Sequence, residues 1–174
     1  MANIAAIKPA TAASGAGADL SALRLEIDEF HALYCETLDR NDVEAWPEFF
    51  TEDAVYRITA RENHEAGLAV GLVYADSKAM LRDRAFAIAR TQMFAPRYLR
   101  HYVTNTRVIS AEGALIQARA NYLLLQTLME GPTTIQQAGV YLDTFLRVEG
   151  RLLLKERQCV YDTLLIANDL VYPV

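Results

Sequence analysis

The feature that most restricts the fold of this chain is a series of four long runs with strand-like patterning, from Tyr98 to Asp162. In the second run, apolar or small residues alternate with polar ones from Ile116 to Tyr122, which is the pattern of a strand with one buried face. A turn signal with a glycine separates each run from the next, and tight turns often need the positive φ that glycine adopts. The sequence therefore predicts four long antiparallel strands in succession, in a sheet that must twist and curl. The three turn signals are Glu112-Gly113, Glu130-Gly131-Pro132 and Glu149-Gly150.

An amphipathic helix is predicted well before these strands. Apolar residues recur there at spacings of three and four, and either Asp19 or Ser21 can cap the first turn. Asn41-Asp42 then interrupts the pattern. We expect the helix to begin near Asp19 and to pack one face on the core. Its apolar stripe consists of Leu20, Leu23, Ile27, Phe30, Tyr34 and Leu38.

Shorter elements are predicted between this helix and the four runs. A short aromatic-rich helix is expected over 43–50, and a third helix, capped by Asp76-Ser77, up to about residue 92. Strand-like runs at 54–61 and 68–74 enclose a polar loop at 62–66. The fold class is therefore α+β, with N-terminal helices packed on one face of a strongly curved, mainly antiparallel sheet, which together form a cone.

Composition and length restrict the domain organisation and the partners. The 174 residues suit one domain, expected over 19–174, while residues 1–18 have the composition of a flexible tail and lack the apolar core of a signal peptide. The net charge is −5 without any basic stripe, which argues against a nucleic-acid partner. No segment is apolar for long enough to span a bilayer. These absences predict a cytoplasmic protein that binds neither nucleic acid nor membrane.

Metal and cofactor motifs are missing from the sequence. Iron and zinc sites need clustered ligands, but the chain has three histidines, far apart, and two cysteines. His31 and Cys35 share one face of the first helix, where a metal site is less expected than a packed helix edge. Cys35 and Cys159 are expected to be reduced and buried, although one disulfide is possible by number. No metal and no cofactor is therefore predicted on this chain.

Acid–base chemistry is harder to exclude from the sequence. His101 on the first long strand and Asp39 at the end of the first helix could form a general-base pair in an apolar cavity, with Tyr34 nearby. The alternative is that His101 is a hydrogen-bonded structural residue. Tyrosines across the strands could likewise line a ligand pocket or simply pack as core and cross-strand pairs. The apolar closing run from Tyr161 to Val174 is expected to dock on its own domain or on a partner.

Three segments, in this order, resemble the small (beta) subunits of bacterial aromatic-ring-hydroxylating dioxygenases. The first runs from Phe30 to Tyr56, and the last from Leu153 to Pro173. The middle segment is similar to the Arg-His-x-Val-Thr-Asn motif of these subunits, so its residues and the closing pair are candidate motif or interface positions. These positions are Arg100, His101, Val103, Thr104, Asn105, Tyr172 and Pro173.

This resemblance implies a fold and a partner that spacing alone does not show. The fold would be the SnoaL-like or NTF2-like (cystatin-like) cone. The chain itself would be non-catalytic, and a large partner subunit would hold a Rieske [2Fe-2S] cluster and a mononuclear Fe(II), reduced by NAD(P)H through a reductase. Three large and three small subunits would assemble, and the small subunit would form a trimer. The substrate would be an aromatic compound, with aromatic carboxylates as the nearest class.

Two other functions remain compatible with the same scaffold, because one fold hosts many activities. One is a stand-alone dehydratase, isomerase or cyclase that uses the His101 pocket. The other is a binding protein for small aromatic acids. Two departures from the small-subunit pattern keep these alternatives open: the segment Glu62 to Gly67 does not match, and Tyr102 stands where a smaller aliphatic residue is expected.

Overall fold

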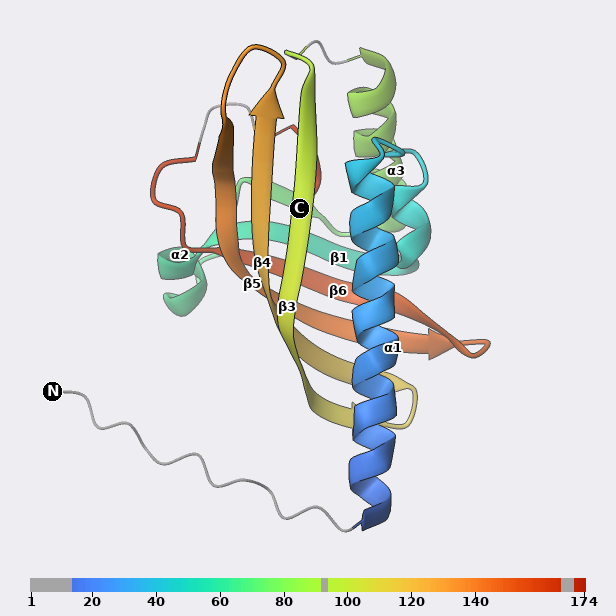
Figure 1. Ribbon diagram of the computed structural model, residues 1–174. Coiled ribbons are helices and arrows are strands. Elements are labelled where there is room, and N and C mark those ends of the chain that lie inside the picture. Colours follow the sequence, from blue (N-terminus) through green and yellow to red (C-terminus); the bar gives the residue numbers. More distant parts are fainter. Residues whose placement is uncertain (1–13, 92–93, 167–170) are drawn as a thin grey trace, which may run out of the picture.

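The computed structural model describes residues 14–91, 94–166 and 171–174 as helices packed against one curved six-stranded sheet (Figure 1). The long helix α1 (Ser14–Asp39) runs the length of the molecule beside the strands. Strands β4 and β5 are upright at one end and sweep round to lie crosswise at the other, which gives the sheet its curl. The predicted α+β architecture, with helices packed on a strongly curved, mainly antiparallel sheet, is confirmed. The strands are β1 (Phe50–Ala60), β2 (Val73–Ala75), β3 (Arg97–Glu112), β4 (Leu115–Leu128), β5 (Thr133–Val148) and β6 (Arg151–Tyr161).

The sheet has the order β2-β1-β6-β5-β4-β3 and is antiparallel except for one pair. Strands β3 to β6 form the predicted meander of four long strands. The first strand, β1, returns to pair in parallel with the last, β6, and so joins the two halves of the sequence. This crossover leaves β3 at one edge of the sheet and the three-residue β2 at the other.

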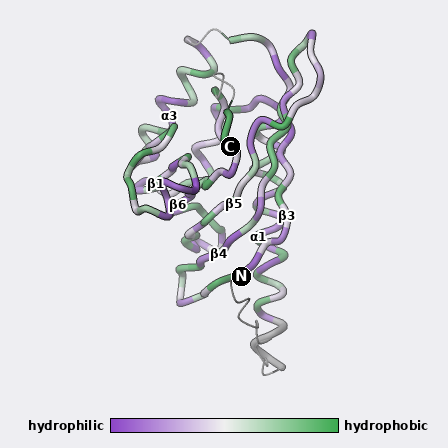
Figure 2. The backbone as a smooth tube through the Cα atoms, turned by 90° about the vertical axis from the view of Figure 1, so that its left-hand side faces the viewer, coloured by the Kyte–Doolittle hydropathy of each residue, from purple (hydrophilic) through white to green (hydrophobic). Residues whose placement is uncertain are grey.

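The alternation predicted for the long strands is present. Buried residues alternate with exposed or half-buried ones along β4, and Figure 2 lets the reader follow the alternating hydropathy along the strands. The turns after β3 and β5 contain Gly113 and Gly150 with φ of 60° and 80°, as predicted. Gly131, in the turn after β4, is not among the glycines with positive φ. A proline follows it, and the residue before a proline is restricted to extended backbone.

The first helix buries most of its predicted apolar stripe and two further residues, His31 and Cys35. Ile27, Tyr34 and Leu38 are buried, whereas Leu20, near the helix start, is 48% exposed. His31 and Cys35 are buried beside the stripe, so the helix covers the sheet with a wider face than the apolar residues alone indicated. α1 begins at Ser14, earlier than the helix start expected near Asp19, because each residue added to a formed helix gains one hydrogen bond. Residues 1–13 of the expected tail lie outside the described residues.

The short elements differ most from their predictions. The helix expected over 43–50 is one 3-10 turn, Trp46–Phe49, where Pro47 has no backbone N–H to continue a longer helix. The loop expected over 62–66 is a short helix, α2 (Arg61–Glu65), which buries no residue and so has no apolar stripe in the sequence. The run 68–74 forms a strand only at Val73–Ala75, and Leu68, Val70 and Leu72 are half-exposed or more.

The third helix agrees more closely with its prediction. α3 (Lys78–Phe86) begins after Ser77, whose Oγ accepts a hydrogen bond from the backbone N–H of Met80 at 3.4 Å. The helix then widens into a π-helical turn over Ala87–Thr91. Its expected apolar side is buried, at Leu81, Ala85 and Ile88. Among the described residues, no helix is both long and apolar enough to cross a membrane.

Gly139 is expected to be intolerant of a side chain, because β5 and β6 approach very closely there. A Cβ at this position would lie 2.1 Å from the main-chain oxygen of Val160 and 2.7 Å from the Cα of Tyr161. Gly139→Ala is therefore expected to lower the free energy of unfolding by about 1–3 kcal/mol through overpacking. Gly131→Ala is the control, since the nearest atom is 3.6 Å away. Equal urea midpoints for the two variants would contradict this account.

Candidate functional site

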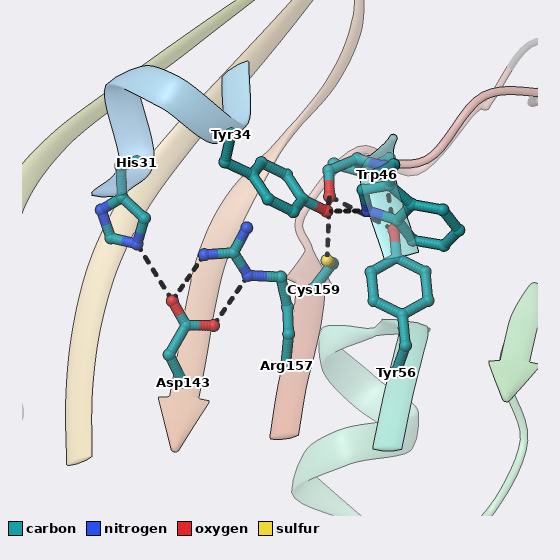
Figure 3. A network of polar contacts seen from close by, with 8 residues as sticks. His31, Tyr34, Trp46, Tyr56, Asp143, Arg157 and Cys159 are labelled. Atoms are coloured by element: carbon teal, nitrogen blue, oxygen red, sulfur yellow. Dashed lines mark hydrogen bonds and ion pairs between the residues drawn. The ribbon is translucent and has the colours of Figure 1, made fainter. Parts of the chain in front are cut away.

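The most unusual feature of the interior is a buried ion pair between β5 and β6 that also holds the first helix (Figure 3). Arg157 donates from Nε to Asp143 Oδ1 at 2.8 Å and from Nη2 to Oδ2 at 2.7 Å, a two-pronged geometry. Nε2 of His31, on α1, lies 3.1 Å from Asp143 Oδ2. All three side chains are almost fully buried. The network thus ties α1 to the concave face of the sheet.

Two tyrosine rings lie against the guanidinium of Arg157, and a third tyrosine stacks on one of them. Its central carbon lies 4.3 Å from the ring centre of Tyr34 and 4.1 Å from that of Tyr141. Tyr122 stacks on Tyr141, with 4.5 Å between the two ring centres. A cation between two ring faces is favoured by the negative faces of the rings. The tyrosines Tyr122 and Tyr141 are therefore core residues and not the lining of an open pocket.

Burial and charge together set the protonation of this network. Burial alone would raise the pKa of Asp143, but the charge of Arg157 and the hydrogen bonds from Arg157 and His31 lower it. Burial lowers the pKa of His31 and outweighs the hydrogen bond to Asp143. Asp143 is therefore ionised at neutral pH, and His31 is neutral with its proton on Nε2, donated to Asp143.

Stability is expected to decrease as the pH falls below the usual histidine pKa of 6.5. In that window the unfolded chain binds a proton that the folded chain excludes from His31, so protonation favours unfolding. The free energy of unfolding should fall by up to about 1.4 kcal/mol per pH unit. Urea unfolding from about pH 7 to about pH 5 measures the slope. His31→Gln, which cannot titrate, should flatten it, and equal slopes would show that His31 is not the cause.

The closing segment 171–174 docks inside its own domain. The main-chain oxygen of Val174 accepts hydrogen bonds from Tyr34 Oη at 3.1 Å and Tyr56 Oη at 3.2 Å, and the Val174 N–H donates to Tyr56 Oη at 2.9 Å. Trp46 Nε1 donates to Tyr34 Oη at 2.8 Å. Tyr172, Pro173 and Val174 are buried, which assigns this part of the apolar closing run to its own core. Residues 167–170 lie outside the described residues.

The structure brings together two of the three residues considered for acid–base chemistry. His101 Nδ1 lies 2.7 Å from Asp39 Oδ1, and the His101 N–H also donates to Asp39, at 3.1 Å. Both side chains are at least 94% buried. Tyr34 is not part of this pair, because its hydroxyl lies between Trp46 and Val174. These hydrogen bonds attach the end of α1 to β3, so the pair has a structural role.

The remaining motif residues lie along β3 around a bulge. Arg100 is exposed and reaches Asp39 Oδ2 at 3.4 Å. Val103 is half-buried, and Thr104 and Asn105 are exposed. The register of β3 on β4 shifts after Thr104, and Asn105 has φ of 57°, a conformation that asparagine tolerates better than most residues. The motif therefore shapes the edge strand of the sheet.

Sequence analysis missed the ion pair of Asp143 and Arg157. A signal for Asp143 existed, because it falls between Tyr141 and Phe145 on the inward-facing positions of a strand. A charged residue at such a position needs a partner of opposite charge. Among the described residues, no group of three or more His, Cys, Asp or Glu side chains could hold a metal ion. His31 and Cys35 are both buried, and His31 is bound to Asp143.

Comparison with known proteins identifies the family. The model of the SnoaL-like domain matches residues 19–158. The chain is also 36% identical, over 139 residues, to subunit beta 1 of the terminal oxygenase component of terephthalate 1,2-dioxygenase from a Comamonas species. This match covers 80% of the chain and 90% of the relative. The chain belongs to the SnoaL-like family, among the small subunits of dioxygenases.

Two further relatives of this SnoaL-like chain are also small subunits of dioxygenases. It is 33% identical to the anthranilate 1,2-dioxygenase small subunit of Burkholderia cepacia, over 81% of the chain and 88% of the relative. The crystal structure of a protein from Novosphingobium aromaticivorans, described as the beta subunit of an aromatic-ring-hydroxylating dioxygenase, superposes with a TM-score of 0.82 at 38% identity. That match covers 88% of the chain and 98% of the solved structure. The resemblance seen in the three sequence segments is confirmed.

Proposed function

We propose that this chain is the non-catalytic, structural small subunit of a Rieske non-haem iron dioxygenase that hydroxylates aromatic carboxylates. Its large partner subunit would carry the Rieske [2Fe-2S] cluster and the mononuclear Fe(II), with electrons from NAD(P)H through a reductase. The observation that carries the proposal is the 33–38% identity to dioxygenase small subunits over most of the chain. Terephthalate and anthranilate, named for two relatives, are both aromatic carboxylates.

The polar interior supports a structural role for this chain. His31, Asp143 and Arg157 bind one another, and His101 binds Asp39. Both clusters join α1 to the sheet, so these groups stabilise the packing of the helix on the strands. Residues 19–174 would form the single domain, with 1–18 as a flexible tail. The complex would contain three large and three small subunits in the cytoplasm, with the small subunits arranged as a trimer and no nucleic-acid or membrane partner.

An apolar patch on the outer face of the sheet is a candidate contact with another subunit. We name it the outer sheet patch. Tyr98 and Ile135 are 67% and 64% exposed, and Tyr102 is 50% exposed, on the face that points away from the buried His101. Exposed apolar clusters of this kind mark interaction sites. Strand pairing places its apolar members side by side around Arg100: Tyr98 and Tyr102 on β3, Leu123 and Leu125 on β4, and Ile135 on β5.

Co-purification from the native host tests the proposal. Tagged chain should recover an iron-containing partner in near-equal amount, while the chain alone should contain no iron. The double variant Tyr102→Asp/Ile135→Asp should recover at least about tenfold less partner, because charges in an apolar contact are costly. Leu25→Asp, at a 70% exposed position on α1, is the control. Recovery without any iron protein would refute the function, whereas normal recovery by the double variant would refute only the patch.

One observation favours a second function. The contact of 2.7 Å between His101 and Asp39 is the arrangement that a general base needs. A stand-alone dehydratase, isomerase or cyclase would then show turnover by the isolated chain that His101→Asn abolishes. A binding protein for small aromatic acids would instead bind benzoate without turnover. We expect neither result from the isolated chain.

A further inference from the structure

Two arginines, which we call the arginine pair, lie directly opposite each other on neighbouring strands. Arg107 on β3 pairs in register with Arg119 on β4. Both are exposed, and neither guanidinium has a hydrogen bond or an ion pair among the described residues. Arginine is not deprotonated in proteins, and like charges directly opposite each other destabilise a sheet. The fold of the chain alone therefore gains nothing from this placement.

The bulge in β3 brings Arg107 to this position. Thr104 pairs with Asn121, and an unbroken register from there would place Arg107 opposite Ala118, which is buried on the inner face of the sheet. A shift of one residue turns a side chain to the other face, so the bulge after Thr104 moves Arg107 to the outer face, opposite Arg119. Bulges re-aim side chains in this way and are common at sheet edges and beside functional sites.

The acidic residues near the arginine pair already have other partners. A hollow of about 380 Å³ beside Arg119 has Asp143 and Glu156 in its lining. Asp143 is buried and bound to Arg157. Glu156 accepts a hydrogen bond from Gln158 at 2.7 Å, and it lies on β6, two strands or about 10 Å of backbone spacing from Arg119. The arginine pair is thus a local positive site on a chain of net charge −5.

The arginine pair lies on the same face of the sheet as the outer sheet patch. Tyr102 of the patch pairs with Leu123, and the arginine pair follows four residues further along β4, at Arg119. Four residues of a strand span about 13 Å, so one partner surface can cover both features. Interfaces between subunits have an apolar centre and a polar rim. The patch and the arginine pair together have this arrangement.

We propose that the arginine pair binds carboxylate side chains of an acidic segment on the large partner subunit, beside the outer sheet patch. This inference rests on the proposed function, because it names the chemistry of the partner at the same face. Each guanidinium offers parallel N–H donors that match the two oxygens of a carboxylate. A carboxylate beside both arginines also offsets the repulsion between their charges. The arginine pair is therefore unfavourable in the isolated chain and favourable in the assembled complex.

Arg119→Glu separates this contact from folding, because its two expected effects have opposite signs. In the isolated chain the new carboxylate lies opposite Arg107, and opposite charges across two strands are stabilising, so the urea midpoint should equal or exceed that of the wild-type chain. Tagged Arg119→Glu chain from the native host should nevertheless recover at least about tenfold less iron-containing partner, because a like charge then faces the acidic segment. Arg151→Glu, at an exposed arginine where β6 begins, makes the same change of net charge and should recover partner like the wild-type chain.

Salt gives a second readout with a milder variant, Arg107→Gln/Arg119→Gln, which removes both charges. Recovery of partner by the wild-type chain should fall between about 50 mM and about 500 mM NaCl, because salt screens exposed charges, whereas recovery by the double variant should be low at both and change little. If the wild-type chain recovers no iron-containing partner, the proposed function is overturned and this inference with it. If the wild-type chain recovers partner, and Arg119→Glu recovers as much as Arg151→Glu or the double variant shows the same salt dependence as the wild-type chain, only the arginine contact is overturned.

Discussion

Asp143→Ala is expected to lower the free energy of unfolding by about 3–5 kcal/mol, the cost of breaking a buried ion pair. Arg157 is fully buried and cannot lose its proton, so removal of Asp143 leaves a positive charge in the core with Tyr34 and Tyr141 as its neighbours. His31 Nε2 would lose its acceptor as well. Urea unfolding, followed by the fluorescence of Trp46, the only tryptophan of the sequence, measures the change.

Two further variants show whether charge or packing causes this loss. Asp143→Leu/Arg157→Met removes both charges at similar volume and should recover much of the stability, since neutral replacement of buried pairs is often tolerated. Glu36→Ala removes an exposed partner of Arg40 and should change the free energy of unfolding by less than about 1 kcal/mol. A loss for Asp143→Ala no larger than that for Glu36→Ala would mean that the buried pair does not stabilise the fold.

Removal of residues 171–174 is expected to lower the free energy of unfolding by at least about 5 kcal/mol. Tyr172 and Val174 are 7% and 0% exposed, and burial of each such side chain contributes about 1.5–3 kcal/mol. The hydroxyls of Tyr34 and Tyr56 would also lose the main-chain oxygen of Val174, and a buried group without a partner costs about 1–3 kcal/mol. The fluorescence of Trp46, which donates to Tyr34, should change in the folded state too.

Single substitutions show how much of this loss in the free energy of unfolding comes from apolar burial and how much from hydrogen bonds. Val174→Ala keeps the main-chain oxygen and should lose only the apolar part, about 1–2 kcal/mol. Leu165→Ala, at a position 91% exposed just before the undescribed residues 167–170, should leave stability unchanged. If the shortened chain unfolds at the same urea concentration as the full chain, the closing segment does not stabilise the interior.

Local sequence patterns predicted an element correctly where the element buries one face and exposes the other. The alternation from Ile116 to Tyr122 identified β4 and its buried face, and the three- and four-residue spacing identified α1 from Leu23 onward. The pair Asp76-Ser77 was recognised as a cap because a side-chain oxygen before a helix has a local partner, and Ser77 is the residue that caps. In each case the interaction lies within a few residues, or the pattern repeats along the element.

The sequence by itself thus determined the fold class, the four-stranded meander and, through three ordered segments, the family. Only the tertiary structure decided the parallel pairing of β1 with β6, the ion pair of Asp143 and Arg157, and the contact of Val174 with Tyr34 and Tyr56. These contacts join residues far apart in the sequence, and no periodic pattern specifies which distant group a buried charge or hydroxyl will meet. The choice depends on the curl of the sheet, which brings inward-facing side chains of several strands to one point.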